Sequence, residues 1–239
     1  MLVVCLFIVV IGLCLGSFSN VLVWRIPNGL GIGGRSICPK CTKKIQWFDN
    51  IPLLSFILLK GKCRNCKSRI SLRYPLIELI TGIIFLLLYL KFGLSSQMVF
   101  LAVISPILVS IFFIDFDHQI IPDVLVFSGI GFSFLYLVFI VPQFFYSSFF
   151  AGLLVSCLLL MLHFLTKGKG MGLGDVKLAL LGGLIVGLTN IFYWFFWAFL
   201  TGAAVGCILI LTKKYELKSK IAFGPFLIFA LFLTILVRL

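Results

Sequence analysis

Long apolar runs dominate the chain, and short polar turns separate them. The hydrocarbon core of a bilayer is about 30 Å thick, and a helix needs about 20 apolar residues to cross it. The pattern predicts eight membrane spans, at residues 2–24, 75–94, 97–114, 124–141, 145–166, 176–190, 191–212 and 222–238. A division of the stretch 176–212 near Thr189 and Asn190 makes the sixth span short. We therefore expect an all-α protein, a polytopic bundle of transmembrane helices.

Composition supports this class. Hydrophobic residues make up 62% of the 239-residue chain, against about half of an ordinary soluble domain. The small number of charged side chains cannot cover a water-soluble globule of this size. Soluble, disordered, collagen-like and coiled-coil proteins are therefore excluded.

Basic residues gather on one side of the predicted spans. More than half of the 20 lysines and arginines lie in the loop 25–74, and loops rich in these residues stay in the cytoplasm. If each span crosses the membrane in the direction opposite to the one before it, both termini lie outside the cytoplasm. Every basic residue except Lys91 and Arg238 then lies on the cytoplasmic side. The net charge of +13 at pH 7 then reflects orientation and attraction to an anionic cytoplasmic leaflet, and nucleic-acid binding is not expected. An aromatic group is expected at the outer interface: Tyr193, Trp194 and Trp197.

Four of the eight cysteines form two C-x2-C pairs in this cytoplasmic loop: Cys38, Cys41, Cys63 and Cys66. Paired knuckles of this kind suit a tetrahedral zinc ion held by four thiolates. The alternative is two disulfides, which are uncommon in the reducing cytosol. A structural metal would fold a loop that is too small to form a core of its own. The other four cysteines lie inside spans and are expected to be buried.

Four of the seven acidic residues lie at the cytoplasmic ends of spans three to six: Asp115, Asp117, Asp123 and Asp175. Ionisable groups at membrane depth are costly, so they are functional candidates. Two close carboxylates can share one proton, and one then acts as base toward water while the other acts as acid. Asp115 and Asp117 are two residues apart and lie on different faces of a helix. We expect Asp115 to be catalytic and Asp117 to be secondary.

Helix capping is the simpler explanation of Asp123 and Asp175, because each directly precedes a predicted span. Capping does not require the four glycines ahead of Asp175, of which Gly172 and Gly174 are the nearest. Glycines let another backbone approach closely, as a substrate strand would. Lys177 either anchors this end of the helix at the cytoplasmic face or stabilises the charge of Asp175.

The remaining acids are expected in ordinary positions. Asp49 and Glu216 lie in polar loops and should be solvated. Glu78 lies four residues into the second span and is expected to pair with a nearby loop arginine. His163, inside the fifth span, is expected to be a packed or hydrogen-bonded core residue.

Two segments resemble the signature segments of the bacterial type IV prepilin peptidases, which are aspartic intramembrane proteases of the GxGD class. They are residues 115–123 (DFDHQIIPD) and 172–178 (GLGDVKL), in the order found in the family. Segments around the cysteine pairs are similar to the family's amino-terminal part: residues 16–21 (GSFSNV), 25–27 (RIP), 47–52 (WFDNIP) and 73–78 (RYPLIE). The similarity covers most of the chain.

The resemblance implies a bifunctional enzyme of the bacterial cytoplasmic membrane with its active site facing the cytoplasm. Members cut prepilin or pseudopilin precursors on the cytoplasmic side of a hydrophobic segment, then methylate the new N-terminus with S-adenosylmethionine. Asp115 and Asp175 match the catalytic pair, with no metal in the peptidase site, and the four cysteines match the metal-binding loop. We expect an N-terminal part, residues 1–94, that carries the cysteine loop, and a peptidase domain, residues 95–239. No methyl-donor site is readable from the sequence.

Two other classes of protein place similar residues in a membrane chain. A transporter carries acids within its spans, but near the middle of the bilayer and not at one rim. A zinc-loop scaffold of an export machine would need the cysteines and not the aspartates.

Overall fold

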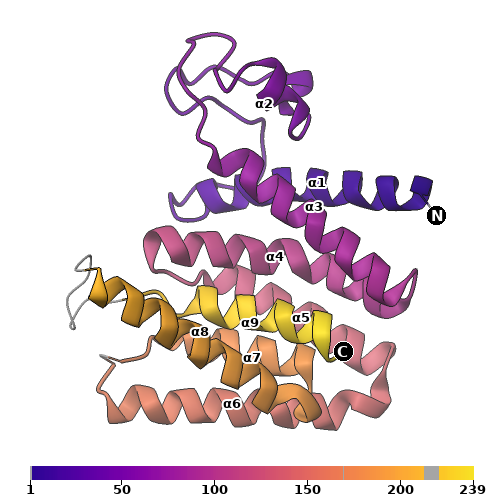
Figure 1. Cartoon of the computed structure of the whole chain (residues 1–239), viewed down its shortest axis with the longest axis vertical. Helices are drawn as coiled ribbons and strands as arrows, with labels where there is room; N and C mark the ends of the chain where they lie inside the picture. Colours follow the sequence, from indigo (N-terminus) through magenta and orange to yellow (C-terminus); the bar gives the residue numbers. More distant parts are fainter. Residues whose placement is uncertain (1, 169, 213–220) are drawn as a thin grey trace. The chain divides into compact units, whose positions relative to one another are not determined.

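The computed structural model describes residues 2–168, 170–212 and 221–239 (Figure 1). The predicted cytoplasmic loop 213–220, with Glu216, lies outside the described residues. The chain divides into two compact units, residues 1–110 and 111–239. Within the described residues the secondary structure is helical, apart from two isolated β-bridges in the cysteine loop.

Eight helices coincide with the eight predicted spans: α1 (Leu2–Arg25), α3 (Arg73–Phe92), α4 (Ser96–His118), α5 (Asp123–Phe139), α6 (Phe145–Leu165), α7 (Leu173–Val186), α8 (Ile191–Leu211) and α9 (Gly224–Val237). Five described helices are long and apolar enough to cross a membrane, and α5 and α9 are shorter apolar helices. The all-α membrane fold is confirmed.

Helix ends differ from the prediction at two places that matter for function. Helix α4 continues to His118, so Asp115 lies within the helix and not in the following turn. Helix α7 begins at Leu173, so Asp175 lies in its first turn and does not precede it. The predicted division after the sixth span is confirmed, because α7 ends at Val186 and the next residue, Gly187, has a left-handed φ of 71°.

In the N-terminal unit, α1 and α3 pack closely through glycines. A Cβ on Gly12 would lie 2.9 Å from Cα of Gly82, and one on Gly16 would lie 2.7 Å from Cα of Glu78. Small residues spaced in this way let helix backbones approach within a membrane. The contact fixes the C-terminal half of α1 beside the start of α3. The loop between these helices contains a 3-10 helix (Trp47–Asn50) and the short α2 (Leu54–Leu58).

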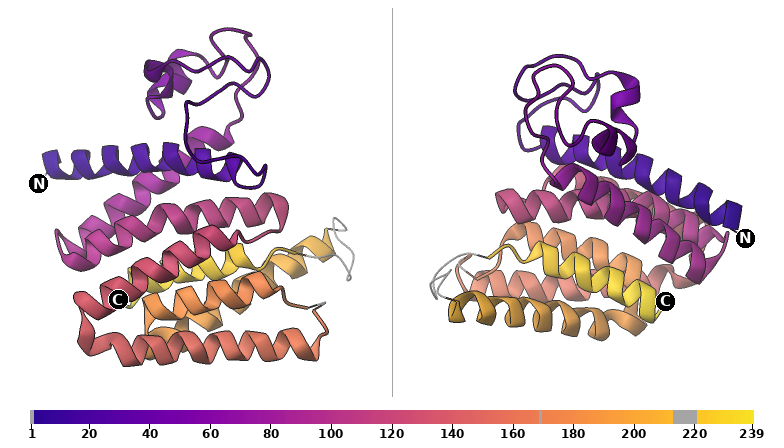
Figure 2. Two further views of the ribbon diagram at one scale, coloured as in Figure 1. Left: turned by 180° about the vertical axis from the view of Figure 1, so that it is seen from behind. Right: turned by 45° about the horizontal axis from the view of Figure 1, so that its top comes forward.

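In the C-terminal unit, α7 lies among α5, α6 and α9 (Figure 2). A Cβ on Gly183 of α7 would lie 2.5 Å from Cα of Gly152 on α6. Ten of the 14 residues of α7 are buried. The helix that carries Asp175 is therefore held on several sides by its neighbours.

Trp194 packs inside the C-terminal unit. Its side chain is fully buried, and the indole ring packs against Gly182, which has no side chain to exclude it. Its Nε1 donates a hydrogen bond to the carbonyl of Leu227 at 2.9 Å. A buried tryptophan needs such a partner for its N–H. The Trp194 ring therefore packs inside the bundle of helices and does not face lipid or water.

Candidate functional site

Two buried carboxylates lie in the C-terminal unit. Asp115 is in the last turn of α4 and Asp175 is in the first turn of α7. Their exposed fractions are only 4% and 8%, and the two carboxylates interact electrostatically. The turns that end α4 and begin α7 thus deliver two acids to one place.

Ile121 and Gly224 complete the surroundings of this pair. A Cβ on Gly224 would lie 2.5 Å from Oδ2 of Asp115 and 3.2 Å from Cδ1 of Ile121. A Cβ on Gly174 would lie 2.9 Å from Cβ of Ile121. The Ile121 side chain therefore packs between the start of α7 and the start of α9. Gly174 is required for this packing of the protein against itself, whereas the sequence suggested access for a substrate strand.

Each aspartate keeps one carboxylate oxygen without a protein partner. Oδ2 of Asp175 accepts the backbone N–H of Gly172 at 3.1 Å. Among the described residues, Oδ2 of Asp115 and Oδ1 of Asp175 are buried and accept no hydrogen bond. Buried polar atoms are rarely left unsatisfied because that costs free energy. These two atoms are the ones available to a bound water molecule or a substrate.

Gly224 is a site residue that the sequence argument missed. It is the first residue of α9 and is followed by Pro225, a pairing typical of a helix start. The N-terminus of a helix carries partial positive charge and favours a nearby carboxylate. Gly-Pro at the start of the last apolar run was a readable signal of a helix start, but no local pattern indicates that this helix meets Asp115.

The other predicted polar residues lie around the pair in different ways. Asp117 is exposed, which agrees with its place on another face of α4 than Asp115. Asp123 is the first residue of α5 and does not cap the helix with its side chain. Lys177 Nζ forms an ion pair with Asp123 Oδ1 at 2.7 Å and lies over the ring of Phe127. This ion pair connects the start of α5 with the start of α7.

His163 holds the glycine-rich segment that precedes Asp175. Its Nδ1 is 2.7 Å from the carbonyl oxygen of Met171, so the expectation of a hydrogen-bonded histidine is confirmed. Gly168 follows the end of α6, has a left-handed φ of 73° and lies beside the His163 ring. The end of α6 and the approach to α7 are thereby tied together.

The N-terminal unit brings the four loop cysteines together. The Sγ atoms of Cys38, Cys41, Cys63 and Cys66 all lie within 4.8 Å of one another. None of the eight cysteines forms a disulfide. Tetrahedral zinc with Zn–S bonds of about 2.3 Å sets its sulfur atoms about 3.8 Å apart, and Sγ of Cys38 lies 3.9 Å from Sγ of Cys66. The four thiols therefore fit a tetrahedral metal ion.

The two cysteine pairs share one backbone conformation. In each, the N–H of the residue after the second cysteine donates to the carbonyl of the first: Thr42 to Cys38 at 2.8 Å, and Lys67 to Cys63 at 3.0 Å. Thr42 and Lys67 both adopt a left-handed φ, of 56° and 58°. The loop thus contains the same knuckle twice, which matches a site that takes two ligands from each half.

Hydrogen bonds stabilise thiolate charge in both knuckles. The hydroxyl and the backbone N–H of Ser68 hold the pKa of Cys66 at about 6, well below its usual value. Burial opposes the change at Cys38, but backbone N–H groups of Cys41 and Lys40 lower its pKa. Metal ligation requires the thiolate form, so these donors favour a metal. The other cysteines differ from expectation, since Cys14, Cys157 and Cys207 are exposed on helix surfaces.

Asp49 corrects another expectation. Its side chain is only 8% exposed and forms an ion pair with Arg64 at 2.6 Å. Arg64 Nε also donates to both carboxylate oxygens of Asp49. The hydrogen-bonded guanidinium holds the pKa of Asp49 below its usual value. Asp49 therefore joins the 3-10 helix to the second knuckle and is not a solvated loop residue.

Comparison with known proteins matches both halves of the chain. Residues 10–92 match the family model of the bacterial peptidase A24 N-terminal domain. Residues 102–207 match the model of the type IV leader peptidase family. The two matches cover the cysteine loop and both aspartate segments.

Three curated relatives carry the name prepilin leader peptidase/N-methyltransferase. The protein from Neisseria gonorrhoeae is 32% identical over 245 residues, which cover 90% of this chain and 84% of the relative. The one from Vibrio cholerae is 34% identical over 200 residues, covering 78% and 79%. The one from Myxococcus xanthus is 45% identical over 117 residues, covering 48% and 35%. No solved structure matches the chain significantly. The chain belongs to the type IV leader peptidase family.

Proposed function

We propose that this protein is an aspartic endopeptidase that cuts the leader peptides of prepilin-like or pseudopilin precursors, with Asp115 and Asp175 as its catalytic pair. The observation that carries the proposal is the pair of buried carboxylates, each with one unpartnered oxygen. Membership of the family supports the reaction class, and the shared name of the relatives supports the substrate.

The geometry supports a mechanism with one shared proton. One carboxylate takes a proton from a water molecule as the water oxygen attacks the scissile carbonyl carbon, and the other carboxylic acid donates its proton to the carbonyl oxygen. The tetrahedral intermediate then collapses, the peptide nitrogen receives a proton and leaves as the new amine, and no acyl-enzyme forms. The two aspartates titrate as one coupled pair.

We further propose that the enzyme methylates the new N-terminus with S-adenosylmethionine. The relatives' name supports the second activity. Cys38, Cys41, Cys63 and Cys66 would hold one zinc ion, whose contribution is structural: it fixes the two knuckles against each other.

The family and the long apolar helices make the chain a multi-pass protein of the bacterial inner membrane. The basic loop 25–74 supports an orientation with both termini outside and the aspartates facing the cytoplasm. Alkaline phosphatase fused after Leu239 should then be active in cells, because it folds only outside the cytoplasm. An inactive fusion, with a cytoplasmic reporter active at the same position, would reverse the orientation.

Product analysis tests the proposed activities together. The purified protein is incubated with a prepilin-like precursor, with and without S-adenosylmethionine, and the products are identified by mass spectrometry. Cleavage is expected in both samples, and addition of one methyl group to the new N-terminus only with the donor. A precursor that stays intact under conditions where a known relative cuts it would refute the peptidase assignment.

The zinc site is tested by elemental analysis of protein purified under reducing conditions. We expect one zinc ion per chain, and Cys63→Ser should weaken zinc binding by more than about tenfold, since loss of even an outer-shell partner costs that much. Cys207→Ser is the matched control, because Cys207 is an exposed cysteine on α8. Wild-type protein without metal, or equal zinc in both variants, would show that the thiols do not form the site.

A further inference from the structure

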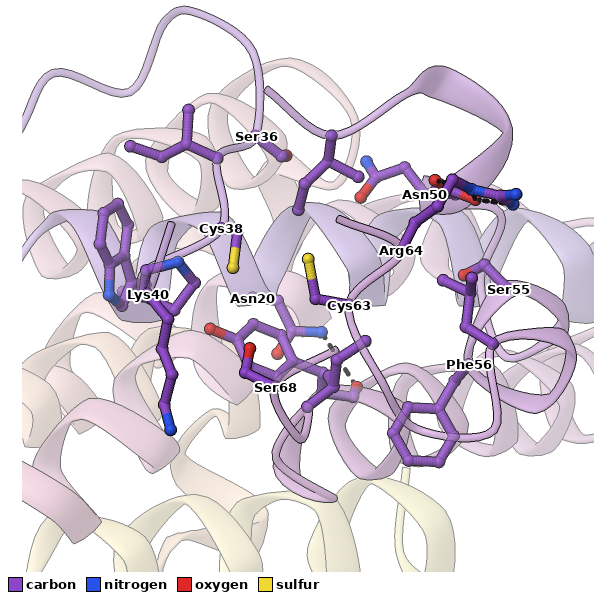
Figure 3. Close-up of a pocket in the computed structure, with 18 of the residues that line it drawn as sticks. Asn20, Ser36, Cys38, Lys40, Asn50, Ser55, Phe56, Cys63, Arg64 and Ser68 are labelled. Atoms are coloured by element: carbon purple, nitrogen blue, oxygen red, sulfur yellow. Dashed lines mark hydrogen bonds and ion pairs between the residues drawn. The ribbon is translucent and has the colours of Figure 1, made fainter. Parts of the chain in front are cut away.

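A cavity of about 230 Å³ lies in the N-terminal unit, between the cysteine knuckles and the helix ends that carry them. Its walls come from the end of α1, both knuckles, α2 and the start of α3. Cys38 and Cys63 line it with their sulfur atoms turned toward each other (Figure 3). The proposed metal centre therefore forms one wall of the cavity, and neither catalytic aspartate contributes to it.

Glu78 supplies a buried carboxylate to the lining of the cavity. Its side chain is 8% exposed, and its Oε2 accepts the backbone N–H of Leu53 at 2.9 Å. The hydroxyl of Ser17 also bonds to it. Both partners are neutral, so they orient the carboxylate without adding a positive charge. Glu78 therefore does not form the ion pair with a loop arginine that was expected from the sequence.

The position of Leu53 is unusual for its residue type. Leu53 has a φ of 59° and a ψ of −48°, a backbone conformation that a residue with a Cβ rarely adopts. This strained residue directs its N–H to Glu78. Strain of this kind persists where the surrounding structure holds it and often marks a binding site.

Two arginines of the lining and its second acid have partners within the protein. The guanidinium of Arg25 donates to backbone carbonyls of the segment 31–35, including those of Gly31 and Arg35 at 3.0 Å. Arg64 is paired with Asp49. Of the two acids in the lining, Asp49 is paired with an arginine, whereas the hydrogen-bond partners of Glu78 are neutral. Glu78 can therefore attract a cationic ligand.

Aromatic and basic side chains complete the lining. Trp24, Phe56 and Tyr74 provide ring surfaces, and Lys40 and Lys43 provide amines. Aromatic rings bind planar bases by stacking and attract cations to their faces. A ligand that suits this set contains an aromatic base, a positive centre and a carboxylate.

We propose that this cavity is the methyl-donor site, and that it binds S-adenosylmethionine with Glu78 facing its positively charged end. The donor combines an adenine ring, a sulfonium, an ammonium and a carboxylate, which match the aromatic, acidic and basic parts of the lining. The inference rests on the N-methylation included in the proposed function. Glu78 is here a binding residue, and its role is to hold the cationic donor.

The methyl transfer that this site would serve balances without a further reactant. The α-amine released by cleavage has a pKa near 8 and gives one proton to solvent. Its nitrogen lone pair attacks the methyl carbon, and the bond between that carbon and sulfur breaks with its electron pair left on sulfur. The products are a methylated secondary ammonium and the neutral thioether S-adenosylhomocysteine.

Donor binding to the full-length protein in detergent, measured by calorimetry with S-adenosylmethionine, tests the site. Ser36→Trp places a large ring in the cavity, and Glu78→Gln removes the charge while keeping an acceptor for the Leu53 N–H. Glu78→Gln is expected to weaken donor binding by about tenfold or more, the effect of losing a charged hydrogen-bonding group. Ser36→Trp is expected to weaken it at least as much, because the ring occupies the space of the ligand. Gln46→Trp introduces the same ring at an exposed position outside the lining and should bind like wild type.

Precursor cleavage and zinc content are measured on the same preparations. Both should stay at wild-type levels in Glu78→Gln, which shows that the variant is folded. Wild-type donor affinity in Ser36→Trp and Glu78→Gln would overturn the cavity assignment, while methylation by the wild-type enzyme would still support the proposed function. Wild-type enzyme that cleaves but neither methylates nor binds the donor would overturn both the methylation and this site.

Discussion

Replacing Asp115 or Asp175 with asparagine is expected to abolish precursor cleavage, with a loss of at least about a thousandfold, because general acid–base groups contribute about 10²- to 10⁴-fold each. Asparagine has nearly the same shape, so the packing around Ile121 and Gly224 should persist. It neither accepts the proton of the attacking water nor donates a proton to the carbonyl oxygen. Cleavage is followed by mass spectrometry of the released leader peptide.

Asp117→Asn is the matched control for this pair. Asp117 lies two residues from Asp115 on the same helix but is exposed, whereas Asp115 is buried. This variant should retain substantial activity. Full activity of Asp115→Asn or Asp175→Asn would refute the aspartic mechanism and would favour a scaffold that needs only its cysteines.

Gly224→Ala is expected to reduce cleavage by about a hundredfold, since displacing a catalytic group by about 1 Å has that effect. The added Cβ would lie 2.5 Å from Oδ2 of Asp115, a distance at which one of the two must move. The same atom would meet Ile121 Cδ1 at 3.2 Å, so the site has little room to relax. Rates are compared at saturating precursor, which separates a displaced catalytic group from weaker binding.

Gly131→Ala controls for a general effect of a methyl group in this unit. Gly131 lies on α5, and a Cβ there would meet nothing within 4 Å. This variant should cleave like wild type and unfold no earlier, because alanine favours helix more than glycine does. Equal activity in both glycine variants would show that α9 does not restrict the position of Asp115.

The helices were predictable because a membrane makes helix formation a local matter. Each span must satisfy its own backbone hydrogen bonds and be apolar over its length, and both conditions can be read from consecutive residues. That Asp115 and Asp117 lie on different faces of α4 also follows from helix geometry alone. The cluster of four cysteines followed from spacing, because two C-x2-C pairs permit few other arrangements.

Contacts between distant segments could not be predicted in the same way. The approach of Gly224 to Asp115 joins residues more than a hundred positions apart, and no local pattern reports it. Glu78 resembled a charge near a helix end, whereas its partner is a backbone N–H of a loop residue in a left-handed conformation. Likewise, no local pattern indicates that Trp194 packs against Gly182 and bonds to Leu227.

The contact between α9 and Asp115 bears on what counts as a complete enzyme of this kind. The family match ends at residue 207, yet the residue that closes the site beside Asp115 is Gly224. A shortened chain ending at Leu211 would keep both signature segments and the five long apolar helices found among the described residues, and would still lack one side of its catalytic pocket. Whether such a protein can cut a precursor is therefore decided by the segment that follows the signatures.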